Sequence, residues 1–309
     1  MPYAGQLAAL GTALCWVATA LSFEAAGRRV GSLTVNLVRL VMAVGLLALH
    51  GWLVRGLALP LDAPPRAWLW LTVSGLVGFT FGDLCLFRAF VVLGSRLATL
   101  MMSLAPPLTA LIGWLVLGEV LAPRDLAGMA LTVGGVAWAV LERRRASPAT
   151  GAAPAPAAAA GELSRSRRLQ GVALGFGGAL GQAGGLVLSK LGMGSYDPFA
   201  STHVRVLAGT AGYLLLFTAL GWWRRLPAAV RDRRAMGFTA VGAFFGPFLG
   251  VSLSLFAVQR IDAGVAASLM ATSPVLILPI VVLAGRERVG AGGWLGALVA
   301  FAGVVLLLR

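Results

Sequence analysis

Long apolar blocks alternate with short polar connections along almost the whole chain. A bilayer core of about 30 Å is crossed by roughly 20 apolar residues in helical form. The sequence contains ten blocks of about that length. They cover residues 5–26, 32–54, 67–90, 97–118, 125–141, 170–190, 199–223, 235–258, 263–284 and 290–308. The pattern predicts an all-α polytopic membrane protein with ten transmembrane helices, and it excludes the water-soluble enzyme folds.

Residues 142–168 differ from the rest of the chain because they are rich in Ala and Pro and are flanked by arginines. Such a segment cannot bury a hydrophobic core, so we expect a solvated, disordered linker there. The linker divides the chain into two halves of five spans each.

The two halves resemble each other in sequence. A shift of 166 residues aligns the first two spans of each half, and a shift of 168 residues aligns the last three. The matched residues are Arg39 with Arg205, Pro106 with Pro274, Glu119 with Glu287, Gly128 with Gly296 and Gly135 with Gly303. An odd number of spans in each copy makes the second copy enter the membrane from the opposite face. The pattern therefore predicts inverted repeats, which are typical of secondary transporters.

The composition agrees with a membrane protein, since 59% of the residues are hydrophobic and only 12% are charged. The formal net charge of +14 does not indicate nucleic-acid binding, because the basic residues lie in short connections between apolar blocks. Lys190 is the only lysine, and this arginine bias together with the many Ala and Gly residues is typical of a GC-rich bacterial genome. We therefore expect a multi-pass protein of the bacterial plasma (inner) membrane.

The stretch from Ala98 to Gly135 carries a small-residue helix, Pro106, an apolar run that ends at Gly118 and Glu119, and two further glycines. Here the sequence resembles the EamA-domain branch of the drug/metabolite transporter superfamily, and the resemblance covers both repeats, residues 6–141 and 171–308. It implies ten helices around a central cavity lined by spans 1, 3, 4, 6, 8 and 9. It also implies export of amino acids or other small metabolites, although relatives move drugs or lipid-linked sugars.

Two prolines, Pro106 and Pro274, interrupt equivalent spans near the bilayer midplane. A proline frees a backbone carbonyl, and paired interruptions point to a transporter's binding site; a tolerated kink is the alternative. Trp16 matches a tryptophan of the family, whereas its mate in the second half is Gln182. The candidates for the substrate path are Trp16, Thr99, Met102, Ser103, Pro106, Gln182, Ser268, Met270, Thr272, Ser273 and Pro274. Ser, Thr, Met and Phe around a cavity favour a neutral or zwitterionic solute.

Ionisable residues inside a membrane are costly and need a partner. Arg39 and Asp83 are predicted to share a depth and to pair, while a snorkelling Arg39 or a proton-coupling Asp83 are the alternatives. Glu24 is expected to meet Arg39 or the Arg28 one helical turn away. Glu119 ends its span beside a loop, where an arginine such as Arg124 is expected to balance its charge.

The arginines also predict the orientation. Sixteen basic residues lie in the connections after spans 1, 3, 5, 7 and 9, and six lie on the other face. Connections rich in arginine stay in the cytoplasm, so the linker is predicted inside and both termini outside. The family resemblance implies the opposite, with both termini in the cytoplasm.

No catalytic residue, metal site or cofactor is indicated. Cys15 and Cys85 fall inside apolar blocks, the two histidines lie far apart, and no glycine-rich phosphate loop precedes a lysine. Without an ATP-binding motif, transport would draw on proton coupling or exchange.

Small residues at four-residue spacing in the sixth and tenth spans predict close helix packing. Those of the tenth span leave open the possibility that two copies of the chain form a homodimer.

The sequence thus predicts a secondary active transporter that exports a small organic metabolite by alternating access. Its expected partners are a small-molecule substrate and the lipid bilayer, with no nucleic acid. A lipid-carrier flippase of the same fold, an intramembrane enzyme and a non-transporting membrane scaffold are the alternatives.

Overall fold

The computed structural model describes residues 3–142, 165–283 and 290–308, and within these ranges the regular structure is helical, with no strand. The helices of the first half are α1 (Ala4–Val30), α2 (Ser32–Arg55), α3 (Pro65–Gly75), the π-helix η1 (Leu76–Gly82), α4 (Asp83–Met102), α5 (Ala105–Leu117) and α6 (Pro123–Glu142). Those of the second half are α7 (Arg165–Met193), α8 (Pro198–Ala219), the 3-10 helix η2 (Trp222–Arg225), α9 (Leu226–Arg231), α10 (Arg233–Ala243), the π-helix η3 (Phe244–Gly250), α11 (Val251–Val258), α12 (Ala263–Met270), α13 (Ser273–Leu283) and α14 (Ala291–Leu307).

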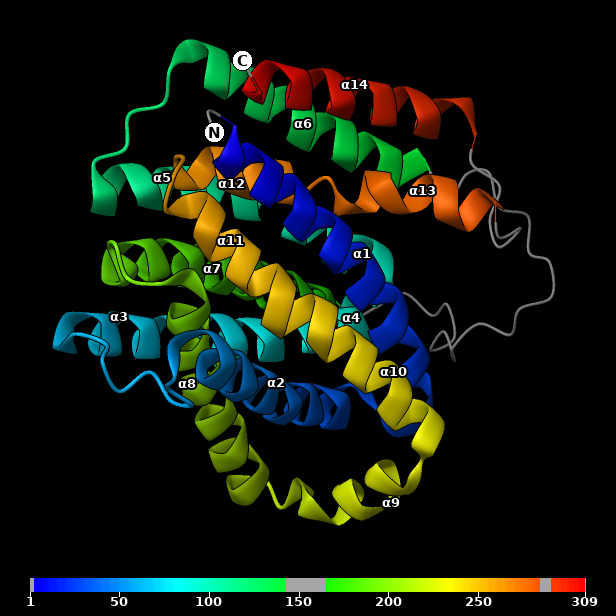
Figure 1. Ribbon diagram of the computed structural model, residues 1–309. Coiled ribbons are helices and arrows are strands. Elements are labelled where there is room, and N and C mark those ends of the chain that lie inside the picture. Colours follow the sequence, from blue (N-terminus) through cyan, green and yellow to red (C-terminus); the bar gives the residue numbers. More distant parts are fainter. Residues whose placement is uncertain (1–2, 143–164, 284–289, 309) are drawn as a thin grey trace.

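The helices account for the ten predicted spans. Among the described residues, seven helices are long and apolar enough to cross a membrane, and α8 with its bent continuation makes up to eight. Two shorter apolar helices, Ala263–Pro279 and Ala291–Leu307, lie at the two remaining spans. Figure 1 shows both termini toward the same end of the helix bundle, as an even number of crossings requires. The all-α polytopic fold is thereby confirmed.

Two predicted boundaries differ in the structure. The seventh span ends at Ala219 and not at residue 223, because Gly221 takes a left-handed conformation (φ 65°) and the chain then bends by 97° into η2 and α9. The helix α7 begins at Arg165, so the last four residues of the predicted linker are helical. Residues 143–164 of that linker, and Glu287 of the repeat alignment, lie outside the described residues.

The internal repeat extends from the sequence to the backbone. Adding 168 to the first residues of α3, η1 and α5 (65, 76 and 105) gives 233, 244 and 273, where α10, η3 and α13 begin. The start of α6 likewise maps onto that of α14, and an offset of 166 maps the start of α2 onto that of α8. Each half therefore carries a π-helical segment and a helix break at the same place.

Packing between the halves pairs equivalent elements. The helix α6 lies along α14, its own equivalent, as the upper part of Figure 1 shows. The helix α1 packs on α10 and α11, just as its equivalent α7 packs on their equivalents α3 and α4. This exchange of partners is expected for two copies related by a pseudo-twofold axis.

Glycines set the closest approaches between helices. A methyl group placed on Gly135 of α6 would lie 2.3 Å from the backbone nitrogen of Ala300 in α14, and one on Gly296 would lie 2.6 Å from that of Ala139. In the same way, a methyl group on Gly181 of α7 would lie 2.5 Å from the Cα of Gly82. The small-residue face of the tenth span is thus filled by α6 of the same chain and is not available to a second copy.

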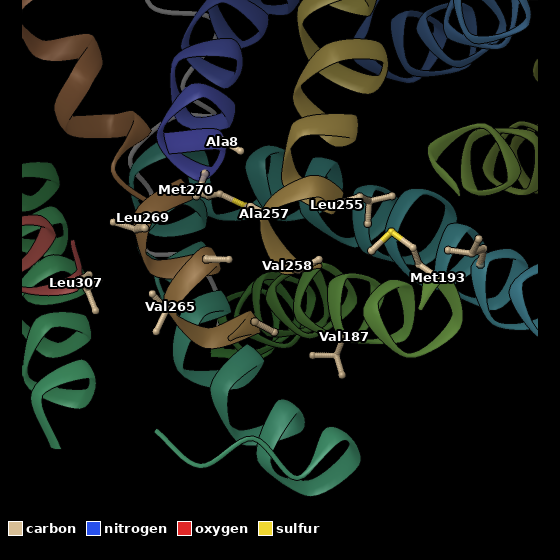
Figure 2. Packing of buried hydrophobic residues seen from close by; sticks show 14 of the residues in the cluster. Ala8, Val187, Met193, Leu255, Ala257, Val258, Val265, Leu269, Met270 and Leu307 are labelled. Carbon is tan, nitrogen blue, oxygen red and sulfur yellow. The ribbon is translucent and has the colours of Figure 1, made fainter. Parts of the chain in front are cut away.

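A buried apolar cluster joins helices that are far apart in sequence. In Figure 2, Ala8 of α1, Ala257 of α11 and Met270 of α12 lie where the three helices converge. Trp16 packs against this cluster, so the cluster fixes the position of one of the predicted path residues.

Polar contacts join connections of the two halves. At the end of α1, Arg29 pairs with Asp232, which precedes α10, at 2.8 Å. Between α7 and α8, the Tyr196 hydroxyl donates a hydrogen bond of 2.9 Å to Asp62, which lies between α2 and α3. The connection after the first helix of each half (α1 or α7) therefore contacts the connection after the second helix (α8 or α2) of the other half.

Glu119 has a partner that the sequence did not indicate. Its carboxylate pairs with Lys190 of α7 at 2.6 Å and accepts a hydrogen bond of 2.9 Å from the backbone N–H of Ala263, the first residue of α12. The expected partner Arg124 lies 3.8 Å from Asp125 instead. Glu119 therefore ties the first half to two elements of the second.

Candidate functional site

A cavity of about 360 Å³ lies between the two halves. This volume falls in the range of about 300–1,000 Å³ that is usual for small-molecule sites. The six spans that the family resemblance implied all contribute to its wall, but so do α2, α6 and α8. The helices α2 and α8 reach the cavity because the long side chains of Arg39 and Arg205 extend into its lining, and α6 contributes Val133 and Val136.

Most of the predicted path residues lie on the cavity wall. Nine of the eleven line it: Trp16, Thr99, Met102, Ser103, Pro106, Gln182, Met270, Ser273 and Pro274. Ser268 and Thr272 lie outside the lining, since both side chains are buried and their hydroxyls donate to backbone oxygens of Gly264 (2.9 Å) and Leu269 (2.7 Å). In this structure these two side chains are therefore not part of the cavity lining.

Equivalent positions of the two halves face each other across the cavity. Met102 and Met270, the last residues of α4 and α12, both line it, and each is followed by a helix break. Pro106 and Pro274, the second residues of the next helices, line it as well. The cavity is therefore lined by residues at the helix breaks of both halves.

The breaks change the hydrogen bonding of the backbone. Pro106 has no N–H to offer to the carbonyl four residues before it, that of Met102. In the second half Pro274 leaves the carbonyl of Met270 in the same position, and the Ser273 hydroxyl lies 3.0 Å from this oxygen as a replacement donor. The same hydroxyl lies 3.1 Å from the carbonyl oxygen of Ala13 in α1. The Ser273 hydroxyl thus supplies a hydrogen bond that the backbone of a regular helix would have made.

The π-helical segments form two further parts of the wall. Phe79 of η1 and its equivalent Pro247 of η3 both line the cavity. A π-helical turn is wider than an α-helical one and is frequent at functional sites. The Thr12 hydroxyl of α1 donates to the carbonyl of Gly250 at the end of η3, at 3.2 Å, which anchors that segment against the first helix.

Arg39 and Asp83 form an ion pair in the cavity wall. Their side chains are only 12% and 7% exposed, and the Arg39 guanidinium lies 5.2 Å from the centre of the Phe23 ring. Glu24 lies away from this pair and binds Arg28 at 2.5 Å, with both side chains more than half exposed. Arg39 and Asp83 therefore belong to the site and Glu24 does not.

Arg205 is a cavity residue that the sequence reasoning did not single out. It is 5% exposed and lines the cavity, with its guanidinium carbon 5.2 Å from the centre of the Phe79 ring. Within the part of the chain that the structure describes, its guanidinium has no hydrogen-bond or ion-pair partner. Two signals in the sequence could have found it: its alignment with Arg39, and its depth of about 10 Å from the start of α8.

No group of three or more His, Cys, Asp or Glu residues among the described ones could hold a metal ion. Cys15 is buried and Cys85 is partly buried. The Cys85 sulfur would lie 3.3 Å from a methyl group on Gly177 of α7, so this side chain fills the space beside a glycine.

Comparisons with known proteins agree with this architecture. A model of the EamA-like transporter family matches residues 3–141 and 169–309. One solved crystal structure has a similar fold, with a TM-score of 0.72 and 19% sequence identity over 99% of this chain and 96% of its own. At that identity the likeness shows the fold alone. No curated protein matches the chain.

Proposed function

The chain belongs to the EamA-like transporter family, and on that premise we propose that it is a secondary active transporter. It exports a small organic metabolite, such as an amino acid, across the bacterial plasma (inner) membrane by alternating access. One observation carries the proposal: a cavity of metabolite size is enclosed by equivalent positions of both halves, at the two helix breaks. A substrate bound there would contact both halves at once.

The contacts between connections support an inverted arrangement of the repeats. The connection after α1 meets the one before α10, whereas the connection after α7, the equivalent of α1, meets the one between α2 and α3. The first connection of each half therefore meets the second connection of the other half, so the contacts are equivalent when the two halves are exchanged. Alternating access by rocking of one repeat against the other follows from such a relation.

The energy for transport comes from an ion gradient or from exchange, since the sequence has no ATP-binding motif. Asp83 is the acidic residue of the cavity lining, and its pairing with Arg39 supports a structural role over proton coupling. A pH gradient imposed on loaded vesicles, compared with an equal gradient of counter-substrate, separates the two sources of energy.

Cysteine accessibility tests the location of the path. In a chain with Cys15→Ala and Cys85→Ala, we expect Ser103→Cys and Ser273→Cys to react with a small permeant thiol reagent. The buried controls Ser268→Cys and Thr272→Cys should stay unmodified, because their side chains do not line the cavity. Equal labelling of all four positions, or inertness of the first two, would contradict the proposed path.

Transport in reconstituted vesicles tests the function itself. Labelled amino acids and small organic acids loaded inside should leave faster than from protein-free vesicles, and excess unlabelled solute should compete. Movement of a lipid-linked sugar alone would identify a flippase. Chemical conversion of the solute without movement would identify an enzyme. The absence of any solute-dependent signal would favour a non-transporting scaffold.

A further inference from the structure

We infer that the transported solute is an organic anion with a single carboxylate and an apolar body, and that Arg205 binds the carboxylate. The inference rests on the proposed transport function, and it names the substrate class of the same cavity. It replaces the expectation of a neutral or zwitterionic solute.

The charge balance of the cavity is the first argument. Among the described residues, Arg39, Asp83 and Arg205 are the charged side chains of its lining. Asp83 pairs directly with Arg39 and attracts Arg205 without a direct ion pair, so the three charges leave the lining with one net positive charge. A guanidinium stays protonated under all ordinary conditions, and an isolated buried charge is costly. A solute with one negative charge would form a second ion pair in the cavity, with Arg205.

The surroundings of Arg205 are the second argument. Its guanidinium lies near the Phe79 ring, and a methyl group on Gly78 would lie only 3.3 Å from Nη2. The glycine therefore provides space where a larger residue would press on the guanidinium. The N–H groups of Arg205 are without protein acceptors among the described residues. Paired N–H groups of a guanidinium match the two oxygens of a carboxylate.

The rest of the cavity wall is the third argument. Its apolar side chains suit a solute with an apolar body, and its charges disfavour a zwitterionic solute. Trp16, Phe87, Leu86 and Met270 present aromatic and aliphatic surface to the cavity. The ammonium group of a zwitterion would need an acid of its own, but Asp83 already binds Arg39. Such a solute would leave the net positive charge of the cavity unchanged.

Three probes of similar shape test the inference: phenylacetate, phenylacetamide and phenethylammonium differ mainly in the charge of the head group. Titration calorimetry on the purified full-length chain should show phenylacetate binding at least tenfold more tightly than the amide, a difference of about 1.4 kcal/mol. Arg205→Gln should remove this preference without changing amide binding, and Arg205→Lys should keep most of it. The control Arg260→Gln, at an exposed arginine outside the cavity lining, should bind like the wild type.

Three results would overturn the inference. These are equal binding of the carboxylate and the amide by the wild type, an unchanged preference in folded Arg205→Gln, and no binding of any monocarboxylate from butyrate to phenylacetate. The comparison of probes on the wild type decides the question even where Arg205→Gln does not fold.

Vesicle transport separates this inference from the proposed function. If phenylacetate binds through Arg205 but no monocarboxylate crosses the membrane faster than in protein-free vesicles, the transport proposal fails while the binding assignment stands. If a neutral or cationic solute is moved equally well by the wild type and by Arg205→Gln, the protein is a transporter and the inference is wrong.

Discussion

Arg39 and Asp83 come from different helices, α2 and α4, and meet in the wall of the cavity. Removing one partner of a buried pair leaves the other charge uncompensated, which costs more than the pair contributes. Loss of Asp83 would be the more severe change, because it would leave two arginines, Arg39 and Arg205, without an acid in the lining.

A double-mutant cycle measures this interaction. The free energies of unfolding of Arg39→Gln, Asp83→Asn and the double variant in detergent should reveal a coupling of about 1 kcal/mol or more, as expected for groups in contact. The exposed pair Glu24 and Arg28 provides the matched control, with an expected coupling of about 0.3–0.5 kcal/mol. Strictly additive losses for the buried pair would rule out the interaction.

The sequence could predict which residue types gather at the cavity but not the direction of every side chain. Pro106, Pro274 and the methionines before them follow from the repeat pattern, and all line the cavity. Thr272 was predicted as a polar neighbour of Pro274, but it lies in a helix break where its hydroxyl turns back to Leu269. Helical periodicity does not extend through a break, so spacing alone cannot place such a residue.

The π-helical segments η1 and η3 show a similar limit for whole helices. Residues 76–82 and 244–250, which form these segments, contain no charged side chain, and so short a run carries no periodic signal that would distinguish a π turn from an α turn. Gly78 and Gly82 of η1, with Gly246 and Gly250 of η3, hold the same places in the two halves. The sequence therefore predicted the boundaries of the helices better than their type, α or π.

Close packing of α7 against η1 can be tested with two neighbouring glycines. Gly181→Ala should lower the stability in detergent by about 1–3 kcal/mol, because the added methyl group would lie 2.5 Å from the Cα of Gly82. Gly184→Ala should be neutral or slightly stabilising, since its methyl group would meet Val77 at an ordinary 3.6 Å. The melting temperatures of both variants in detergent measure this difference. An equal loss of stability in the two variants would contradict the close approach of α7 and η1.

The whole molecule is held together by contacts between its halves as much as within them. Glu119 joins the end of α5 to Lys190 and to the first residue of α12, while α6 and α14 interlock through their glycines. The repeat pattern predicted that the halves are equivalent. It could not predict the contact of Glu119 with Lys190, because Glu24, the equivalent of Lys190, carries the opposite charge and binds within its own helix.

The orientation in the membrane is the prediction that concerns the molecule as a whole. The excess of arginines on the side of residues 142–168 predicts that this side faces the cytoplasm and that both termini lie outside. A C-terminal fusion to a reporter that folds only in the cytoplasm should therefore stay dark, and the same reporter inserted near residue 155 should be bright. The reverse result would place both termini inside, as the family resemblance implies.

The step in the repeat offset from 166 to 168 has an evolutionary consequence. It falls between the second and third helices of each half, where residues 56–64 in one copy correspond to residues 222–232 in the other. A duplicated gene that afterwards gained or lost two codons at this point would produce this pattern. The first residues of α3, η1, α4, α5 and α6 all keep the offset of 168 from their counterparts, while the longer copy also carries η2 and α9. A change of length in this connection therefore leaves the register of the later helices intact, and chimaeras between relatives can be joined there if the contacts of Asp62 and Asp232 are kept.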